Sequence, residues 1–129
     1  MPQKLPLAAL DDPEVRLPYR GLCRLLEAGA RDWVCPDFGL RLALEFDARA
    51  SFPNNLQSAV ALVEDVGHPA LGLCLDWFHY TVGPSKPLDL YLLAPELLAH
   101  VQLSDIVEVP REMATDADRI LPEIGRAHV

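Results

Sequence analysis

The sequence has few cysteines and few basic residues, and both shortages exclude classes of protein. Its 129 residues include three cysteines, Cys23, Cys35 and Cys74, with no Cys-x-x-Cys pair. An odd number at these spacings indicates neither a disulfide framework nor a cysteine zinc site. Lys and Arg number 11 against 19 Asp and Glu, which gives a formal net charge of −8. This balance disfavours non-specific binding to the phosphate backbone of nucleic acids.

Long apolar runs are also missing from the sequence. No stretch approaches the roughly 18 apolar residues that span a bilayer. One lysine, Lys4, precedes a proline-interrupted apolar run over residues 5–10, which is too short and irregular for a signal peptide. We therefore predict a cytoplasmic protein with no membrane partner and no nucleic-acid partner, folded as a single domain.

Apolar periodicity predicts alternating helices and strands after a loosely ordered lead-in at residues 1–13. Helical spacing predicts helices over residues 14–29 and 56–67, and a short or broken one over 88–98, where Pro95 interrupts the pattern. Strands are predicted at residues 39–46, 71–76 and 101–104, and the pattern dissolves after Asp105 into a charged, proline-flanked segment. The alternation favours an α/β fold with parallel strands, which must be covered on both faces or closed into a barrel.

Each predicted strand has one face of large apolar residues and one of small or polar residues. Because side chains alternate along a strand, Glu45 shares the second face of the first strand with Ala43, and Asp76 shares that of the next with Cys74. Ligands of parallel α/β folds bind at the carboxyl ends of the strands. Glu45 and Asp76 are both expected there, so we predict a site where they meet.

His79 follows Asp76 by three residues and extends this candidate site. A carboxylate and an imidazole at one strand end can share a divalent cation, or one can bind the metal while the other handles a substrate. The alternative is that Asp76 caps a turn beside a surface histidine. Glu45 at an equivalent strand end favours the functional interpretation.

Four blocks of the sequence resemble the sugar phosphate isomerase/epimerase superfamily, the xylose isomerase-like barrels that include inosose dehydratase-like, hydroxypyruvate isomerase-like and tagatose 3-epimerase-like proteins. Leu42-Ala-Leu-Glu45 resembles the family's fifth strand, and Leu73-Cys-Leu-Asp76-Trp-Phe-His79 resembles its sixth. His100-Val-Gln-Leu-Ser-Asp105 is similar to the seventh strand, and Arg119-Ile-Leu-Pro122-Glu-Ile-Gly125 to the loop that follows it. The resemblance covers residues 19–125.

This resemblance implies a (β/α)8 barrel with a divalent metal, Mn, Mg or Zn, at its C-terminal mouth. It also implies proton transfer next to a carbonyl, through an enediolate, on a sugar or sugar phosphate. Glu45 would then be a metal ligand and the general base, Asp76 a metal ligand, and His79 a catalytic residue that contacts the substrate. Gln102 stands where the family has a histidine ligand, and its neutral oxygen binds Zn or Mn more weakly than imidazole does. Loss of the metal is therefore the alternative to a divalent ion at this site.

Two further residues are candidates for substrate contact. Trp77 could form an apolar wall beside a substrate, or it could pack against the protein. Arg111 could bind a phosphate, as could Arg119, because an arginine that contacts substrate often follows the seventh strand in barrels of this kind. The alternative for both arginines is a solvated loop.

We expect residues 14–129 to form the C-terminal part of a TIM barrel, with family strands five to seven, because a complete barrel needs about 250 residues. The family's last metal-binding glutamate, on the eighth strand, has no counterpart before Val129. An open sheet leaves unpaired edges. We therefore expect either a fragment or a half-barrel that pairs with a second copy or with a chain carrying the missing half.

Three functions are compatible with these patterns. The first is a metal-dependent isomerase or epimerase whose isolated chain is incomplete as a catalyst. The second is a non-catalytic half-barrel remnant or interaction module. The third is a relative of the zinc endonucleases that cleave abasic DNA, which the acidic net charge disfavours.

Overall fold

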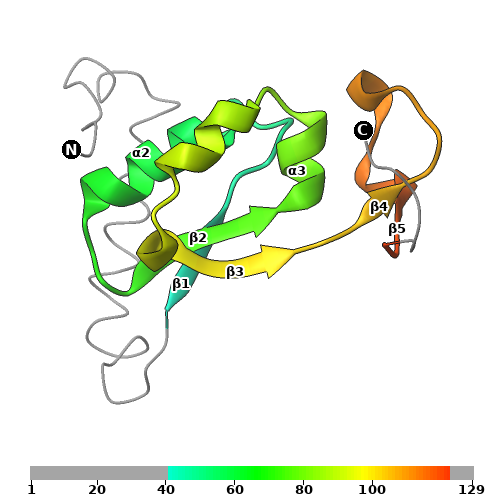
Figure 1. The fold of residues 1–129 in the computed structure, drawn as a ribbon. Coiled ribbons are helices and arrows are strands. Elements are labelled where there is room, and N and C mark those ends of the chain that lie inside the picture. Colours follow the sequence, from blue (N-terminus) through cyan, green and yellow to red (C-terminus); the bar gives the residue numbers. More distant parts are fainter. Residues whose placement is uncertain (1–40, 123–129) are drawn as a thin grey trace.

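The computed structural model describes residues 41–122, and a three-stranded parallel sheet forms their centre (Figure 1). Its strands are β1 (Leu42–Glu45), β2 (Leu71–Asp76) and β3 (Leu98–Gln102), in the order β1-β2-β3. The register places Glu45 opposite Cys74, and Asp76 opposite Gln102. The predicted α/β class and the parallel, unclosed sheet are confirmed. The elements predicted at residues 1–13 and 14–29 lie outside the described residues.

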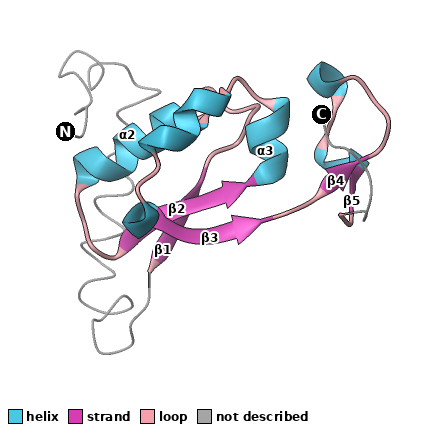
Figure 2. Ribbon diagram, in the orientation of Figure 1, coloured by secondary structure: helices cyan, strands magenta, loops and turns pink. Residues whose placement is uncertain are grey.

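Helix α2 (Leu56–Val66) covers one face of the sheet (Figure 2). Its N-cap is Asn55, whose side-chain oxygen accepts a hydrogen bond from the Ser58 N–H at 2.9 Å. Its C-cap is Gly67, which has a φ of 62°, a left-handed conformation that glycine adopts without steric cost. The helix predicted over residues 56–67 is thus confirmed, and both of its ends have a local cause.

The main core lies between α2 and the apolar face of the sheet. Leu71, Leu73 and Leu75 of β2 alternate toward it, and Phe46 joins them after the end of β1. From α2 the buried Leu56, Ala59, Val60 and Val63 pack against these side chains. The opposite face of β2 therefore carries Gly72, Cys74 and Asp76, as the alternation predicts.

In the second half of the chain, the predicted break at Pro95 in the helical segment 88–98 is confirmed, whereas the bounds of the third strand need correction. Residues 88–98 form two 3-10 helices, η3 (Pro87–Leu92) and η4 (Pro95–Leu97), because a proline begins each of them and Pro95 prevents a continuous helix. The third strand is Leu98–Gln102 rather than 101–104, since the chain becomes extended directly after the single turn of η4.

Helix α3 (Trp77–Val82) was not expected from the sequence. It begins at the end of β2, where Asp76 is its N-cap and accepts a hydrogen bond from the Phe78 N–H at 3.0 Å. A six-residue helix is too short to show a clear apolar period, and its cap was interpreted as a site residue.

The segment after residue 104 is folded, whereas the sequence predicted a loss of pattern. Strands β4 (Asp105–Ile106) and β5 (Arg119–Ile120) pair in antiparallel orientation, with 3-10 helices η5 (Arg111–Met113) and η6 (Asp116–Asp118) between them. A second core cluster joins Phe78 and Val82 of α3 to Ala114, Ile106 and Val109. This cluster holds the C-terminal segment beside α3, at the carboxyl end of the sheet (Figure 1).

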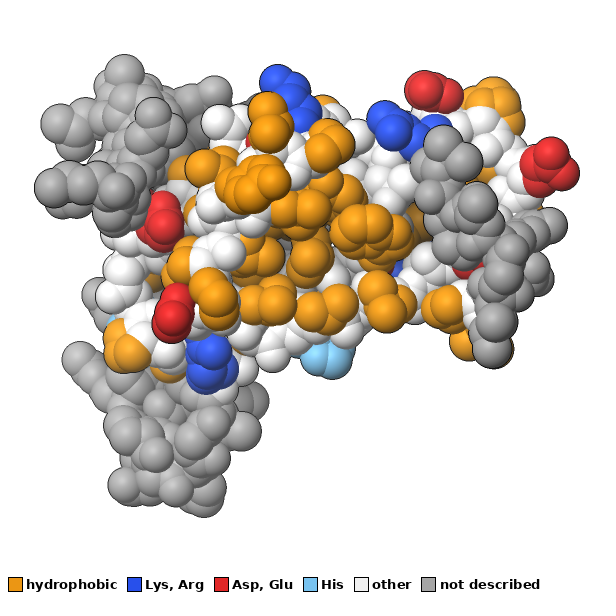
Figure 3. Space-filling model, in the orientation of Figure 1, with side chains coloured by type: hydrophobic (Ala, Val, Ile, Leu, Met, Phe, Trp, Pro, Cys, Tyr) orange, Lys and Arg blue, Asp and Glu red, His pale blue; other side chains and the backbone are white. Residues whose placement is uncertain are grey.

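One face of the molecule is rich in exposed apolar side chains (Figure 3). Among the described residues β3 pairs with β2 alone, so one edge of the sheet is open. Exposed large apolar residues on β3, in η3 and in the loop after β3 include Leu88, Tyr91, Leu92, Val101 and Leu103. Within residues 41–122, no helix is long and apolar enough to cross a bilayer.

Candidate functional site

Glu45, Asp76 and His79 meet at the carboxyl end of the sheet. Glu45 is the last residue of β1, Asp76 is the last of β2, and His79 lies in the first turn of α3. One ligand atom from each residue lies within 4.8 Å of the other two. The predicted convergence of the two strand ends with His79 is therefore present in the structure.

Asp76 is completely buried, and both of its carboxylate oxygens have hydrogen-bond donors. Oδ1 accepts the Phe78 N–H that begins α3. Arg119 Nη2 lies 2.8 Å from Oδ1 and 2.6 Å from Oδ2. Asp76 therefore caps a turn, as the alternative interpretation of the sequence has it, and it is also a member of the cluster.

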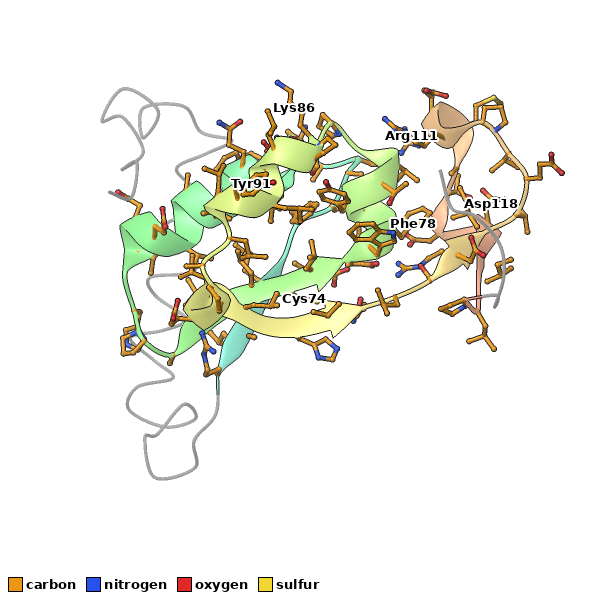
Figure 4. The ribbon with its side chains drawn as sticks, in the orientation of Figure 1. Cys74, Phe78, Lys86, Tyr91, Arg111 and Asp118 are labelled. Carbon is orange, nitrogen blue, oxygen red and sulfur yellow. The ribbon has the colours of Figure 1, made fainter. Side chains whose placement is uncertain are left out.

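Arg119 is the ion-pair partner of Asp76, and the sequence does not predict this pairing. Its guanidinium also lies 4.8 Å from the centre of the Phe78 ring, and its Nη1 is 3.1 Å from Asp116 Oδ1. Phe78 extends from α3 toward the segment that carries Asp118 (Figure 4). The sequence indicates Arg119 as a possible phosphate-binding residue and as part of a family-like loop over residues 119–125, and neither signal identifies Asp76 as its partner.

His79 is buried, and its Nδ1 accepts a hydrogen bond from the backbone. The Ala48 N–H donates to His79 Nδ1 at 3.2 Å, so the neutral imidazole carries its hydrogen on Nε2. Nε2 lies 3.7 Å from Glu45 Oε1 and 3.9 Å from Asp76 Oδ2. Asp47 Oδ1 lies 3.6 Å from Nδ1 and is a further acidic neighbour that the sequence did not indicate. His79 therefore presents an N–H donor to the centre of the cluster.

Glu45 is the most accessible member of the cluster, with 38% of its side chain exposed. Burial of the remainder raises the pKa of its carboxyl, and the hydrogen bond and negative charge of Asp76 raise it further. Electrostatic interactions with His79 and Arg119 oppose this increase. A carboxyl group that is exposed and has a raised pKa suits proton transfer at neutral pH.

The other predicted site residues lie around this cluster or away from it. Gln102 is exposed at the end of β3, in register with Asp76 on the neighbouring strand. Trp77 is partly exposed and stacks on Tyr80, with ring centres 4.7 Å apart. This contact agrees with the alternative in which Trp77 packs against the protein. Arg111 is exposed in η5, beside α3 (Figure 4). The three-residue cluster includes none of these side chains.

The donor set fits a divalent cation that prefers oxygen. Glu45 and Asp76 contribute carboxylates, and Gln102 is in register with Asp76 on the next strand. In the neutral imidazole of this arrangement, His79 Nε2 carries the hydrogen. This nitrogen therefore donates a hydrogen bond and cannot bind a metal while it keeps that hydrogen. Carboxylate and carbonyl oxygens are ligands that Mg²⁺ and Mn²⁺ accept readily.

Acidic residues after the third strand have structural partners. Asp116 pairs with Arg119, and Asp118 accepts hydrogen bonds from the backbone N–H and the hydroxyl of Thr115. A relative of the abasic-site endonucleases would need extra His and Asp metal ligands after the third strand, and these are the aspartates available there. Because Asp116 and Asp118 already have partners in their own segment, the structure gives the endonuclease alternative no support.

Comparison with known proteins gives matches to one family. The profile of the xylose isomerase-like TIM barrel matches residues 13–125. The inosose isomerase of Halalkalibacterium halodurans is 30% identical over 93 residues, which cover 71% of this chain and 33% of that protein. A crystal structure of the IolI protein with a bound zinc atom superposes with a TM-score of 0.68 at 25% identity, over 81% of this chain and 36% of that one. The chain thus spans about a third of the length of these relatives.

Proposed function

Because the chain belongs to the xylose isomerase-like TIM barrel family, we propose that it provides part of the metal and catalytic site of a sugar isomerase or epimerase. The observation that carries the proposal is the meeting of Glu45, Asp76 and His79 within 4.8 Å at the carboxyl ends of parallel strands. The similarity to an inosose isomerase suggests an inosose-like keto compound as substrate.

Glu45 and Asp76 would hold the divalent ion, with Gln102 as a further oxygen ligand from β3. A bound divalent ion would polarise the substrate carbonyl and stabilise negative charge on its oxygen. The zinc atom bound in the crystal structure of the IolI protein supports a metal in this chain as well. The oxygen-rich donor set here favours Mg²⁺ or Mn²⁺.

Glu45 is the proposed base for a hydrogen on the carbon next to the carbonyl. Its side chain is accessible at 38% exposure, and its raised pKa brings its basicity closer to that needed at neutral pH. Returning the proton to the former carbonyl carbon, with transfer of the hydroxyl proton to the former carbonyl oxygen, would complete an isomerisation. An epimerisation would need a second acid that supplies a proton from the opposite face. The Nε2–H of His79 would donate a hydrogen bond to a substrate oxygen.

The open sheet supports an assembly in which a second chain completes the site. Within the described residues, β3 pairs on one side only, and exposed apolar side chains lie along this region. Unpaired sheet edges associate readily with other strands. A second copy or a chain that carries the remaining strands would supply the missing ligands.

A non-catalytic half-barrel module is the alternative function. The Asp76–Arg119 ion pair favours it, because the buried carboxylate is neutralised without any metal. Binding of one Mn²⁺ per chain that is lost in Asp76→Asn would contradict this alternative.

The test combines assembly, metal content and turnover. Light scattering and elemental analysis on one sample should give a defined oligomer with about one divalent ion per chain. That assembly, incubated with inosose in D₂O, should incorporate deuterium next to the carbonyl. Glu45→Gln should abolish incorporation, whereas Glu64→Gln, on helix α2, is the matched control and should retain it. Unchanged incorporation in Glu45→Gln would refute the assignment of the base.

A further inference from the structure

The Arg119 guanidinium is bound to the Asp76 oxygen that faces the centre of the cluster. Oδ1 of Asp76 is already the N-cap of α3, since it accepts the Phe78 N–H at 3.0 Å. Oδ2 is the oxygen that faces His79 Nε2, at 3.9 Å, and therefore belongs to the centre of the cluster. Arg119 Nη2 lies 2.6 Å from this same oxygen.

The arginine is held in place but is not enclosed. The second core cluster fixes its segment against α3, and Arg49 adds hydrogen bonds to the carbonyl oxygens of Glu112 and Ala114. The Arg119 side chain is 25% exposed, and its other nitrogen, Nη1, already contacts Asp116, which is 71% exposed. The guanidinium thus has a second carboxylate to which it can move without refolding of β5.

A divalent ion and Arg119 would share Oδ2. Ligand distances for Mg²⁺ and Zn²⁺ are about 2.0–2.2 Å, and Arg119 Nη2 lies 2.6 Å from the same oxygen, so the ion and the guanidinium would be close neighbours. The two cations would repel each other in a site whose carboxylate is fully buried. Entry of the metal therefore favours departure of Arg119 from Asp76.

We propose that Arg119 is an exchangeable counterion of Asp76, which neutralises the buried carboxylate in the metal-free chain and competes with the divalent ion for Oδ2. This inference rests on the proposed metal site. It adds that the metal affinity of the site is lowered by a residue of the chain itself, and that metal binding releases Arg119 toward Asp116.

Calorimetric titration of the full chain with Mn²⁺ tests the competition. Arg119→Gln should bind Mn²⁺ about tenfold more tightly or better, a typical size for coupling between two binding events. Arg111→Gln is the matched control, because it removes the same charge from an exposed position in the same segment and should leave the affinity nearly unchanged. Asp76→Asn should lose the binding.

The outcomes separate this inference from the proposed function. Equal gains in Arg119→Gln and Arg111→Gln, or no gain in either, would overturn the competition while loss of binding in Asp76→Asn kept the metal site. Wild-type affinity in Asp76→Asn, or no binding by any variant, would overturn the metal site and the competition together.

A measurement on the wild-type chain avoids any effect of the substitution on folding. The Arg119 side-chain N–H resonances should be protected from exchange in the metal-free protein, because Asp76 is buried. Addition of diamagnetic Mg²⁺ should remove that protection. Protection that persists at saturating Mg²⁺ would contradict the displacement.

Discussion

Replacing Gly72 with alanine tests whether the sheet face that carries the site needs a residue without a side chain in its central strand. A Cβ on Gly72 would lie 2.8 Å from the Leu97 carbonyl oxygen, 2.8 Å from the Ala99 Cβ and 2.6 Å from Arg41 Nη2. Cβ atoms essentially never approach other atoms to less than 3.0 Å, so the neighbours would have to move. The Gly72 backbone itself tolerates alanine, because among the described glycines only Gly67 has a positive φ.

The expected cost follows from which neighbours can move. Arg41 is exposed and can turn away, giving up its 3.0 Å hydrogen bond to the Glu96 carbonyl. The Leu97 oxygen and the Ala99 Cβ are fixed to the backbone, so β3 would have to shift from β2. Overpacking of this kind costs about 1–3 kcal/mol, against a gain of roughly 0.4–1 kcal/mol from the less flexible unfolded chain. We expect a net loss of about 0.5–2 kcal/mol in the free energy of unfolding.

Urea unfolding followed by far-UV circular dichroism measures this loss in Gly72→Ala. The same substitution in an Arg41→Ala background should cost nearly as much, because two of the three close contacts remain. A Gly72→Ala chain at least as stable as wild type would refute the reasoning. Full recovery in the Arg41→Ala background would show that only the arginine, and not β3, opposes the added methyl group.

Two further predictions concern titratable groups on the same face. The raised pKa of Glu45 means that the stability contributed by its protonated carboxyl is present at acidic pH, below the unfolded-state pKa, and is lost as the pH rises through the folded-state pKa. As the pH rises through this range, the free energy of unfolding should fall less in metal-free Glu45→Gln than in the metal-free wild type. Urea unfolding at several pH values measures this difference, and the same pH dependence in both chains would contradict it. Burial, together with the charges of Glu45 and Asp76, raises the pKa of the Cys74 thiol. In a C23S/C35S chain, iodoacetamide should therefore modify Cys74 much more slowly than in urea; equal rates would disprove the expected protection.

The parts of the fold that the sequence predicts well have short-range causes. Helix α2 has an apolar period, an asparagine N-cap and a glycine C-cap, all within its own residues and their neighbours. Strand β2 is a run in which leucines alternate with small residues, and its bounds agree with the prediction at both ends. The alternation of faces on two such strands was also enough to place Glu45 beside Asp76.

The parts that the sequence does not predict depend on contacts between distant residues. Strands β4 and β5 have two residues each, too few to show alternation, and they are held by the contact of Ala114 with Phe78 and Val82. The position of the His79 proton depends on an N–H donor, that of Ala48, from the loop after β1. The partner of Arg119 is 43 residues away in the chain. Periodicity contains no information about such pairs.

Asp76 connects the fold to the proposed chemistry, and this determines which substitutions are informative. Its Oδ1 begins α3, while its Oδ2 is shared between Arg119 and the centre of the cluster. Alanine at this position would remove the helix cap, the ion pair and the candidate metal ligand together, so a loss of function would have no single cause. Asparagine keeps an oxygen for the Phe78 N–H and removes the charge. Arg119 pairs with Asp76 and Asp116 and lies over the Phe78 ring, and it can be changed without removing any proposed ligand. Variants of Arg119 therefore report on how the site is occupied, whereas variants of Asp76 report on whether a site exists.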